Sequence, residues 1–150
     1  MIKLFFKTAI TLLIILSITL VNISTVSAQN MKKLNDWNVH YIALDSTFIT
    51  PKIAKAYQIT RSRYNALVNI SVLDNTKSGN PAKNVSITGT AKNNLGQFKT
   101  IEFTEVTEGD AIYYLAQISV NHEETVHFDL AITDGKKSQN LKFYQKFYID

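Results

Sequence analysis

Apolar and polar residues alternate along most of the chain after residue 36, which is the pattern of half-buried β-strands. Residues 125–133 are the clearest case, because large apolar residues occupy every second position there. The same pattern predicts further strands over residues 37–44, 66–73, 85–92, 98–106, 111–120 and 141–149. Residues 66–73 are apolar on most of both faces, so we expect a central strand there.

Turn-forming residues separate these seven predicted strands, at a spacing of roughly 10 to 13 residues. The connections are too short for helical crossovers, so neighbouring strands are expected to be antiparallel. The sequence therefore predicts an all-β fold, an antiparallel immunoglobulin-like β-sandwich. A closed eight-stranded barrel is the alternative.

One short helix is predicted near residues 51–57. Thr50 can cap its first turn, Pro51 suits the first helical position, and Ala54 and Ala56 favour helical backbone. Ile53 and Tyr57 lie four residues apart, so they can bury one side of the helix.

The first 28 residues have the organisation of a secretory signal peptide. Lys3 and Lys7 give a positive start, residues 9–21 are uncharged and apolar, and Val26-Ser27-Ala28 supplies the small residues that a signal peptidase reads. An uncleaved membrane anchor is the alternative, but its apolar run is shorter than the roughly 20 residues of a membrane span. We predict a signal-peptide helix, cleavage after Ala28 and export.

Cleavage would leave residues 29–36 as a flexible lead-in and residues 37–150 as a single β-sandwich domain. The formal charge falls from +4 to +2, with 14 basic and 12 acidic residues, so a nucleic-acid partner is not indicated. Cysteine is absent, which excludes disulfide bonds and thiol chemistry. No membrane span is expected in the mature chain, and its oligomeric state is not indicated.

Three segments carry a resemblance to a known family: VHYIALDSTFITPKIAKAYQITRSRYNALVNISVLD, GTAKNNLGQFKTIEFTEVTEGDAIYYLAQI and KFYQKFYID. They resemble small exported bacterial proteins classified as domain of unknown function 4426. The resemblance covers nearly all of the mature chain and implies one domain in the periplasm of a Gram-negative bacterium. It implies no activity, ligand or catalytic residue.

Arg61 and Arg63 are the only arginines, and they lie just before the predicted central strand. In an extended chain both guanidinium groups point to one side and can bind a carboxylate or phosphate, with Tyr57 and Tyr64 as stacking neighbours. Alternatively, the arginines form ion pairs with nearby acids and have a structural role. These four residues are the candidate binding site, with an envelope protein, a peptide or an anionic small molecule as the predicted partner.

Catalytic and metal-binding patterns are weak. His40, His122 and His127 do not have the spacing of a metal motif, although Glu123 and Glu124 are nearby. There is no cysteine and no Gly-x-Ser-x-Gly motif. We therefore predict a non-enzymatic binding module of the envelope without cofactor or metal. The alternatives are a metal-binding protein or enzyme that uses His, Asp or Glu residues, and a structural or stress factor that pairs with clients through a strand edge.

Overall fold

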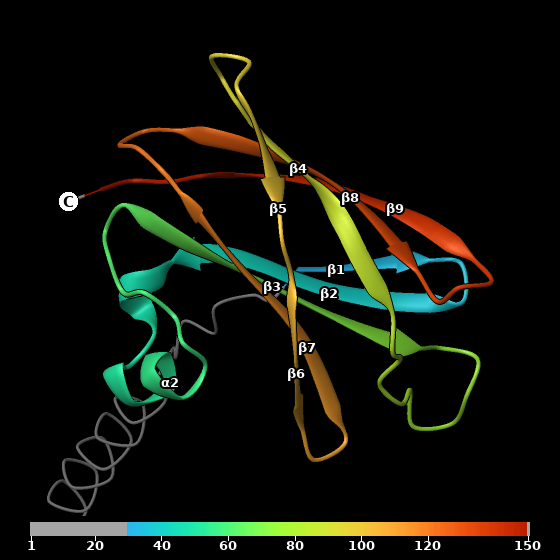
Figure 1. The fold of residues 1–150 in the computed structure, drawn as a ribbon. Coiled ribbons are helices and arrows are strands. Elements are labelled where there is room, and N and C mark those ends of the chain that lie inside the picture. Colours follow the sequence, from blue (N-terminus) through green and yellow to red (C-terminus); the bar gives the residue numbers. More distant parts are fainter. Residues whose placement is uncertain (1–29, 150) are drawn as a thin grey trace, which may run out of the picture.

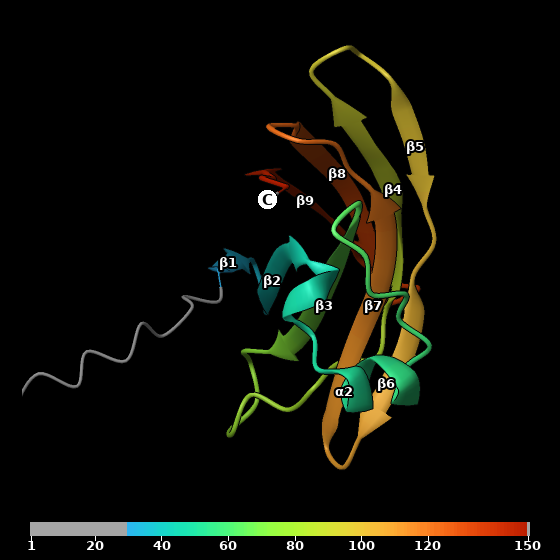
Figure 2. The ribbon, with the colours of Figure 1, turned by 90° about the vertical axis from the view of Figure 1, so that its left-hand side faces the viewer.

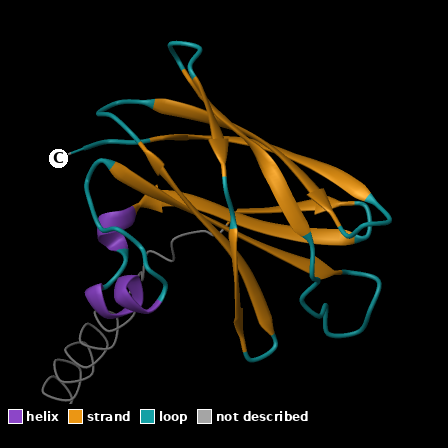
Figure 3. Cartoon of the chain, in the orientation of Figure 1, coloured by secondary structure: helices purple, strands orange, loops and turns teal. Residues whose placement is uncertain are grey.

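The computed structural model describes residues 30–149, so the predicted signal peptide lies outside the described residues. The described chain is mostly strand, with two short helical segments (Figure 3). In chain order the elements are β1 (Asn30–Leu34), β2 (Trp37–Asp45), the 3-10 helix η1 (Ser46–Phe48), α2 (Pro51–Ala56), β3 (Asn65–Asp74), β4 (Ser86–Asn93), β5 (Phe98–Ile101), β6 (Thr104–Glu108), β7 (Ala111–Ser119), β8 (Thr125–Thr133) and β9 (Ser138–Lys146).

Two antiparallel sheets pack face to face (Figure 1). We call the sheet with the order β1-β2-β3-β7-β6 sheet A, and the sheet with the order β5-β4-β8-β9 sheet B. Without β1, this order is the A-B-E-D and C′-C-F-G arrangement of immunoglobulin domains. The predicted immunoglobulin-like β-sandwich is confirmed, and the two separate sheets are not a closed barrel. Between residues 30 and 149 there is no helix long and apolar enough to cross a membrane.

The strand predicted over residues 98–106 is in fact two strands. β5 pairs with β4 in sheet B, whereas β6 pairs with β7 in sheet A, so residues 102–103 pass from one sheet to the other (Figure 1). Ile101 is buried and Phe103 packs against the same core. The alternation of apolar residues therefore continues through the crossing. For this reason the sequence pattern does not reveal that the chain changes from one sheet to the other.

The predicted flexible lead-in, residues 29–36, also differs from the structure. Asn30–Leu34 forms β1 and pairs with β2, after which Asn35 turns the chain with a φ of 53°. Leu34 packs against the core, which gives the strand one apolar anchor. Lys32 and Lys33 are exposed on this edge strand, where charged side chains discourage pairing with another molecule.

The predicted helix and central strand are confirmed. Thr50 caps α2, because its Oγ1 accepts a hydrogen bond of 3.4 Å from the backbone N–H of Ile53. β3 lies between β2 and β7 in the middle of sheet A, and it is apolar on both faces because one face packs on the core and the other lies beside the helical segment. The last predicted strand begins earlier than expected, at Ser138, and ends at Lys146.

The core lies between the sheets and combines aliphatic side chains with a few large aromatic ones. Trp37 and Phe128 are each only 2% exposed, and the Phe128 and Phe143 rings stack with centroids 4.5 Å apart. Tyr41 of sheet A contacts Phe143 of sheet B, with ring centroids 4.6 Å apart. The core therefore holds the two sheets together without any disulfide.

Candidate functional site

The segment that follows α2 is held rigidly against sheet A. Gln117 of β7 accepts a hydrogen bond from the Thr60 N–H and donates one to the Thr60 carbonyl, each 2.9 Å long. The Ser46 side chain is fully buried, and its Oγ bonds both the N–H and the carbonyl of Ser62 at 2.9 Å. Side chains on this segment therefore keep a fixed position over the sheet.

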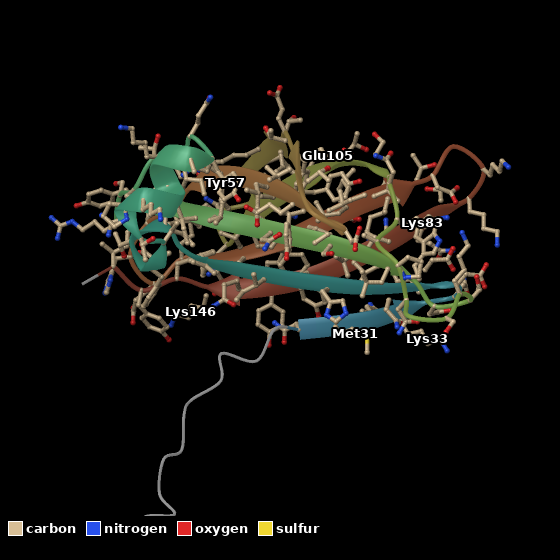
Figure 4. All side chains as sticks on the ribbon, turned by 90° about the horizontal axis from the view of Figure 1, so that it is seen from below. Met31, Lys33, Tyr57, Lys83, Glu105 and Lys146 are labelled. Atoms are coloured by element: carbon tan, nitrogen blue, oxygen red, sulfur yellow. The ribbon has the colours of Figure 1, made fainter. Side chains whose placement is uncertain are left out.

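A groove lies between the helical segment and the outer face of sheet A, the face directed away from sheet B. In Figure 2, α2 lies beside β6 and β7. We call this hollow of about 290 Å³ the α2 groove. Its lining consists of Ile49, Ile53, Tyr57, Ile59, Leu67, Asn69, Val106, Glu108, Tyr113 and Leu115. Figure 4 labels Tyr57, where the chain leaves α2.

A second hollow of about 170 Å³ continues the α2 groove toward Glu102. The two hollows adjoin, because five residues line both of them: Tyr57, Ile59, Leu67, Val106 and Leu115. Together they follow β6 and β7 along the outer face of sheet A. The combined cavity is elongated, with an apolar middle section.

The apolar floor explains why a helix covers this face. The outer face of a sandwich sheet usually carries polar side chains, but β3 and β7 contribute Leu67 and Leu115 here. Ala54 of α2 is buried, and its carbonyl accepts a 2.8 Å hydrogen bond from the Ile59 N–H. The helical segment shields part of the apolar floor and leaves the rest as the groove.

Asn69 places a polar group in this apolar surface. It lies between Ile42 and Leu115 in the strand register. Its Oδ1 atom is buried and has no hydrogen-bond partner within the described residues. A buried acceptor without a partner costs about 1–3 kcal/mol, and such an atom calls for a functional or structural explanation. Because this atom is closed to solvent, a ligand in the groove would meet the rest of the half-buried Asn69 side chain rather than Oδ1.

The four residues predicted as a binding site do not converge. Tyr57 lines the α2 groove, whereas Arg61, Arg63 and Tyr64 do not line it. Arg61 donates a 3.0 Å hydrogen bond from Nη2 to the Thr47 carbonyl, a structural contact but not the ion pair with an acid that the alternative expected. The Arg63 guanidinium lies 5.3 Å from the Tyr64 ring centroid. Asn69, Val106 and Tyr113 were not predicted as site residues, because alternation assigns them only to strand faces.

The three histidines occupy separate places. His40 lies opposite Met31 at the β1–β2 edge of sheet A. His122 accepts a 3.1 Å hydrogen bond at Nδ1 from the Ile149 N–H. His127 lies against the Tyr144 ring on sheet B, with centroids 5.8 Å apart. Across residues 30–149, no three His, Cys, Asp or Glu side chains gather closely enough to share a metal ion.

A wider hollow of about 510 Å³ lies on the outer face of sheet B. The charged side chains in its lining already have partners. Asp129 accepts hydrogen bonds from Asn140 at 2.9 Å and from Lys142 at 2.6 Å, and these bonds lower the pKa of its carboxyl, with Lys142 contributing most. Lys92 lies 5.1 Å from the Phe98 ring centroid. The α2 groove, where the Glu108 carboxylate has no hydrogen bond or ion pair within the described residues, is therefore the stronger candidate site.

The fold and the groove define an immunoglobulin-like β-sandwich with a candidate binding site on its outer face. The family model described as domain of unknown function (DUF4426) matches residues 31–150, so the chain belongs to this family. The resemblance noted in the sequence is thereby confirmed. None of the curated proteins shows significant similarity to the chain.

Three solved structures illustrate the relationship. The crystal structure of the DUF4426 family protein PA0388 from Pseudomonas aeruginosa PAO1 has a TM-score of 0.72 and 28% identity, and the match covers 83% of this chain and 98% of that one. FetP from a uropathogenic E. coli strain has a TM-score of 0.54 and 14% identity, covering 81% and 94% of the two chains. A copper-bound FetP variant has a TM-score of 0.53 and 15% identity, and the match covers 82% of this chain and 92% of that one. The FetP structures share the fold.

Proposed function

We propose that this protein is exported to the periplasm and acts there as a non-enzymatic binding protein, with its ligand in the α2 groove. The observation that carries the proposal is the apolar α2 groove itself, with Asn69 as a polar group in its lining. An apolar groove with a few polar groups is typical of small-molecule binding sites. The rigid anchoring of residues 60 and 62 would preserve the shape of the groove before the ligand binds.

The periplasmic location rests on the signal-peptide pattern of residues 1–28. The absence of cysteine is compatible with export, because the fold needs no disulfide bond there. The resemblance to exported proteins of Gram-negative bacteria points the same way. An envelope function as a structural or stress factor would need an edge-strand partner instead, and the lysines of β1 argue against pairing at that edge.

Copper binding belongs to the FetP variant, whose similarity to this chain extends to the fold. We do not extend it to this protein, because His40, His122 and His127 lie on different elements without a shared set of donors. Elemental analysis of protein purified from the periplasm would decide between the two functions. A stoichiometric metal would favour the metal-binding alternative.

The binding proposal is tested with Nile red, a neutral apolar dye. We expect its fluorescence to rise when it enters the α2 groove of the folded, mature protein. Val106 is half-buried and lines both hollows, so Val106→Trp would fill the cavity and weaken dye binding at least tenfold. Circular dichroism would check that the variant folds.

Thr88→Trp is the matched control. Thr88 is exposed on β4 in sheet B and does not line the groove, so this variant should bind the dye as the parent does. Equal dye affinity of the folded Val106→Trp variant and the parent would place the binding elsewhere and overturn the proposal.

A further inference from the structure

Two carboxylates without partners mark the ends of the elongated cavity. Glu108 lines the α2 groove and Glu102 lines its continuation. Both side chains are exposed, and neither makes a hydrogen bond or ion pair within the described residues. Among the other described carboxylates, that of Asp110 also lacks such a partner. The remaining ones each have a hydrogen bond or an ion pair: Asp36, Asp45, Asp74, Glu105, Glu123, Glu124, Asp129 and Asp134.

The cavity contains no cationic side chain to balance these charges. None of its lining residues is Lys, Arg or His, and the lysines of α2, Lys52 and Lys55, are exposed and outside the lining. Asp110 lies in the turn just after Glu108 and adds to the negative charge at that end. The cavity therefore attracts a cation and repels an anion.

The middle of the cavity supplies the remaining recognition groups. Leu67, Val106 and Leu115 would contact methylene groups of a ligand. Tyr57 and Tyr113 present aromatic rings, which attract ammonium groups. Asn69 adds a polar, half-buried side chain to this section of the lining.

We propose that the ligand is a linear aliphatic diamine or polyamine. Its methylene chain would lie on the apolar floor, and its terminal ammonium groups would point toward Glu102 and Glu108. This inference depends on the proposed binding function of the α2 groove. It replaces the anionic ligand class expected from the arginine pair with a cationic one for this cavity.

The length of the cavity suits an extended molecule. Glu102 and Glu108 are six residues apart in the sequence, so their backbone positions are separated by at most about 20 Å. Their side chains can lean inward and shorten this span. A flexible linear diamine can adjust its length to this spacing and contact both carboxylates, whereas a compact cation would contact only one of them.

Isothermal titration calorimetry on the mature protein tests the ligand class with three probes of equal chain length: 1,8-diaminooctane, 1-octylamine and 1-octanol. We expect affinity to fall in that order and to decrease with rising ionic strength for the two amines alone. Spermidine should compete with 1,8-diaminooctane for the site. Displacement of Nile red by 1,8-diaminooctane would place the amine in the groove.

Glu102→Gln and Glu108→Gln test the roles of the carboxylates. Each change should weaken 1,8-diaminooctane binding about two- to fivefold, the range for an exposed ion pair, and leave 1-octanol binding unchanged. Asp110→Asn is the control, because Asp110 is also unpartnered but does not line the cavity. It should alter diamine affinity less than either glutamine variant does.

The outcomes separate the two proposals. If 1-octanol binds as tightly as 1,8-diaminooctane and the glutamine variants bind both equally, the amine inference is overturned while groove binding stands. If the diamine binds but Val106→Trp does not weaken it, the amine site lies elsewhere and the inference is also overturned. If neither the probes nor Nile red bind, the proposed function itself fails.

Discussion

Two asparagines in strands show how one side chain can serve opposite purposes. Asn93 is 8% exposed and fully bonded, since its Nδ2 donates to Gln97 and Glu124 at 2.8 Å and its Oδ1 accepts backbone N–H groups. Asn69 Oδ1 has no partner. The first asparagine stabilises a turn, and the second leaves a buried acceptor unsatisfied.

The same substitution at these two sites should therefore change stability in opposite directions. Asn69→Leu removes an unsatisfied acceptor, so we expect the free energy of unfolding to stay equal or rise by about 1 kcal/mol. Asn93→Leu breaks several buried hydrogen bonds and should lower it by at least about 2 kcal/mol. Urea denaturation would measure both values. A large loss of stability in Asn69→Leu would mean that Asn69 has a structural role that we have not assigned.

Asp134 is a residue whose ionisation is coupled to the fold. It accepts hydrogen bonds from the N–H groups of Lys137 and Lys136 and lies 3.0 Å from Lys83 Nζ. These contacts, led by the Lys137 N–H, hold the pKa of its carboxyl well below the usual value. The folded protein therefore keeps this carboxylate charged at a pH where the unfolded chain takes up a proton.

The pH dependence follows from this difference. Asp134 contributes stability above the unfolded pKa of about 4, and the contribution is lost as the pH falls toward the folded pKa. We expect the free energy of unfolding to decrease as the pH is lowered from 5 to about 2, less steeply in Asp134→Asn than in the parent. Asp110→Asn serves as the control, because Asp110 has no partner. Identical slopes for Asp134→Asn and the parent would contradict the assignment.

At the scale of elements, β4 and β8 leave no room for a side chain at Gly89. A Cβ atom on Gly89 would lie 2.3 Å from the Asp129 carbonyl oxygen and 2.7 Å from Leu130 Cδ2. The sequence pattern places Gly89 on the inward face of this strand, but it does not reveal that the facing backbone is so near. A glycine is required at position 89 because the backbone of β8 occupies the space that a Cβ atom would need.

Gly89→Ala should therefore destabilise the protein by about 1–3 kcal/mol, because the β4–β8 pair must separate to admit the methyl group. Thr88→Ala, at an exposed position next to it in β4, should have a smaller effect. Chemical denaturation of both variants would measure the difference. Equal stability of Gly89→Ala and the parent would show that the strands separate at little cost.

At the scale of the whole molecule, alternation predicted the sandwich because most strands have one buried and one exposed face. It did not predict β1, in which Leu34 is the apolar anchor and the remaining side chains are exposed. It also did not predict the α2 groove, which is formed by residues far apart in the chain, such as Tyr57 and Val106. Which strands pair, and which face of a sheet is covered by another segment, depend on contacts between residues that are distant in the chain. Local periodicity therefore does not determine them.

Export makes a prediction about the complete chain. Cleavage after Ala28 would produce a mature protein that begins at Gln29, one residue before β1. We expect the intact mass of protein recovered from the periplasm to correspond to residues 29–150. A mass that includes residues 1–28 would instead indicate an anchored protein.

The crossing at residues 102–103 joins sheet A to sheet B through a single continuous backbone. Because Ile101 and Phe103 both contact the core, the sheets cannot part without pulling these anchors out. We infer that the domain unfolds as one cooperative unit. Glu102 lies at this seam, so a ligand held there would slow the opening of both sheets rather than protect one local segment.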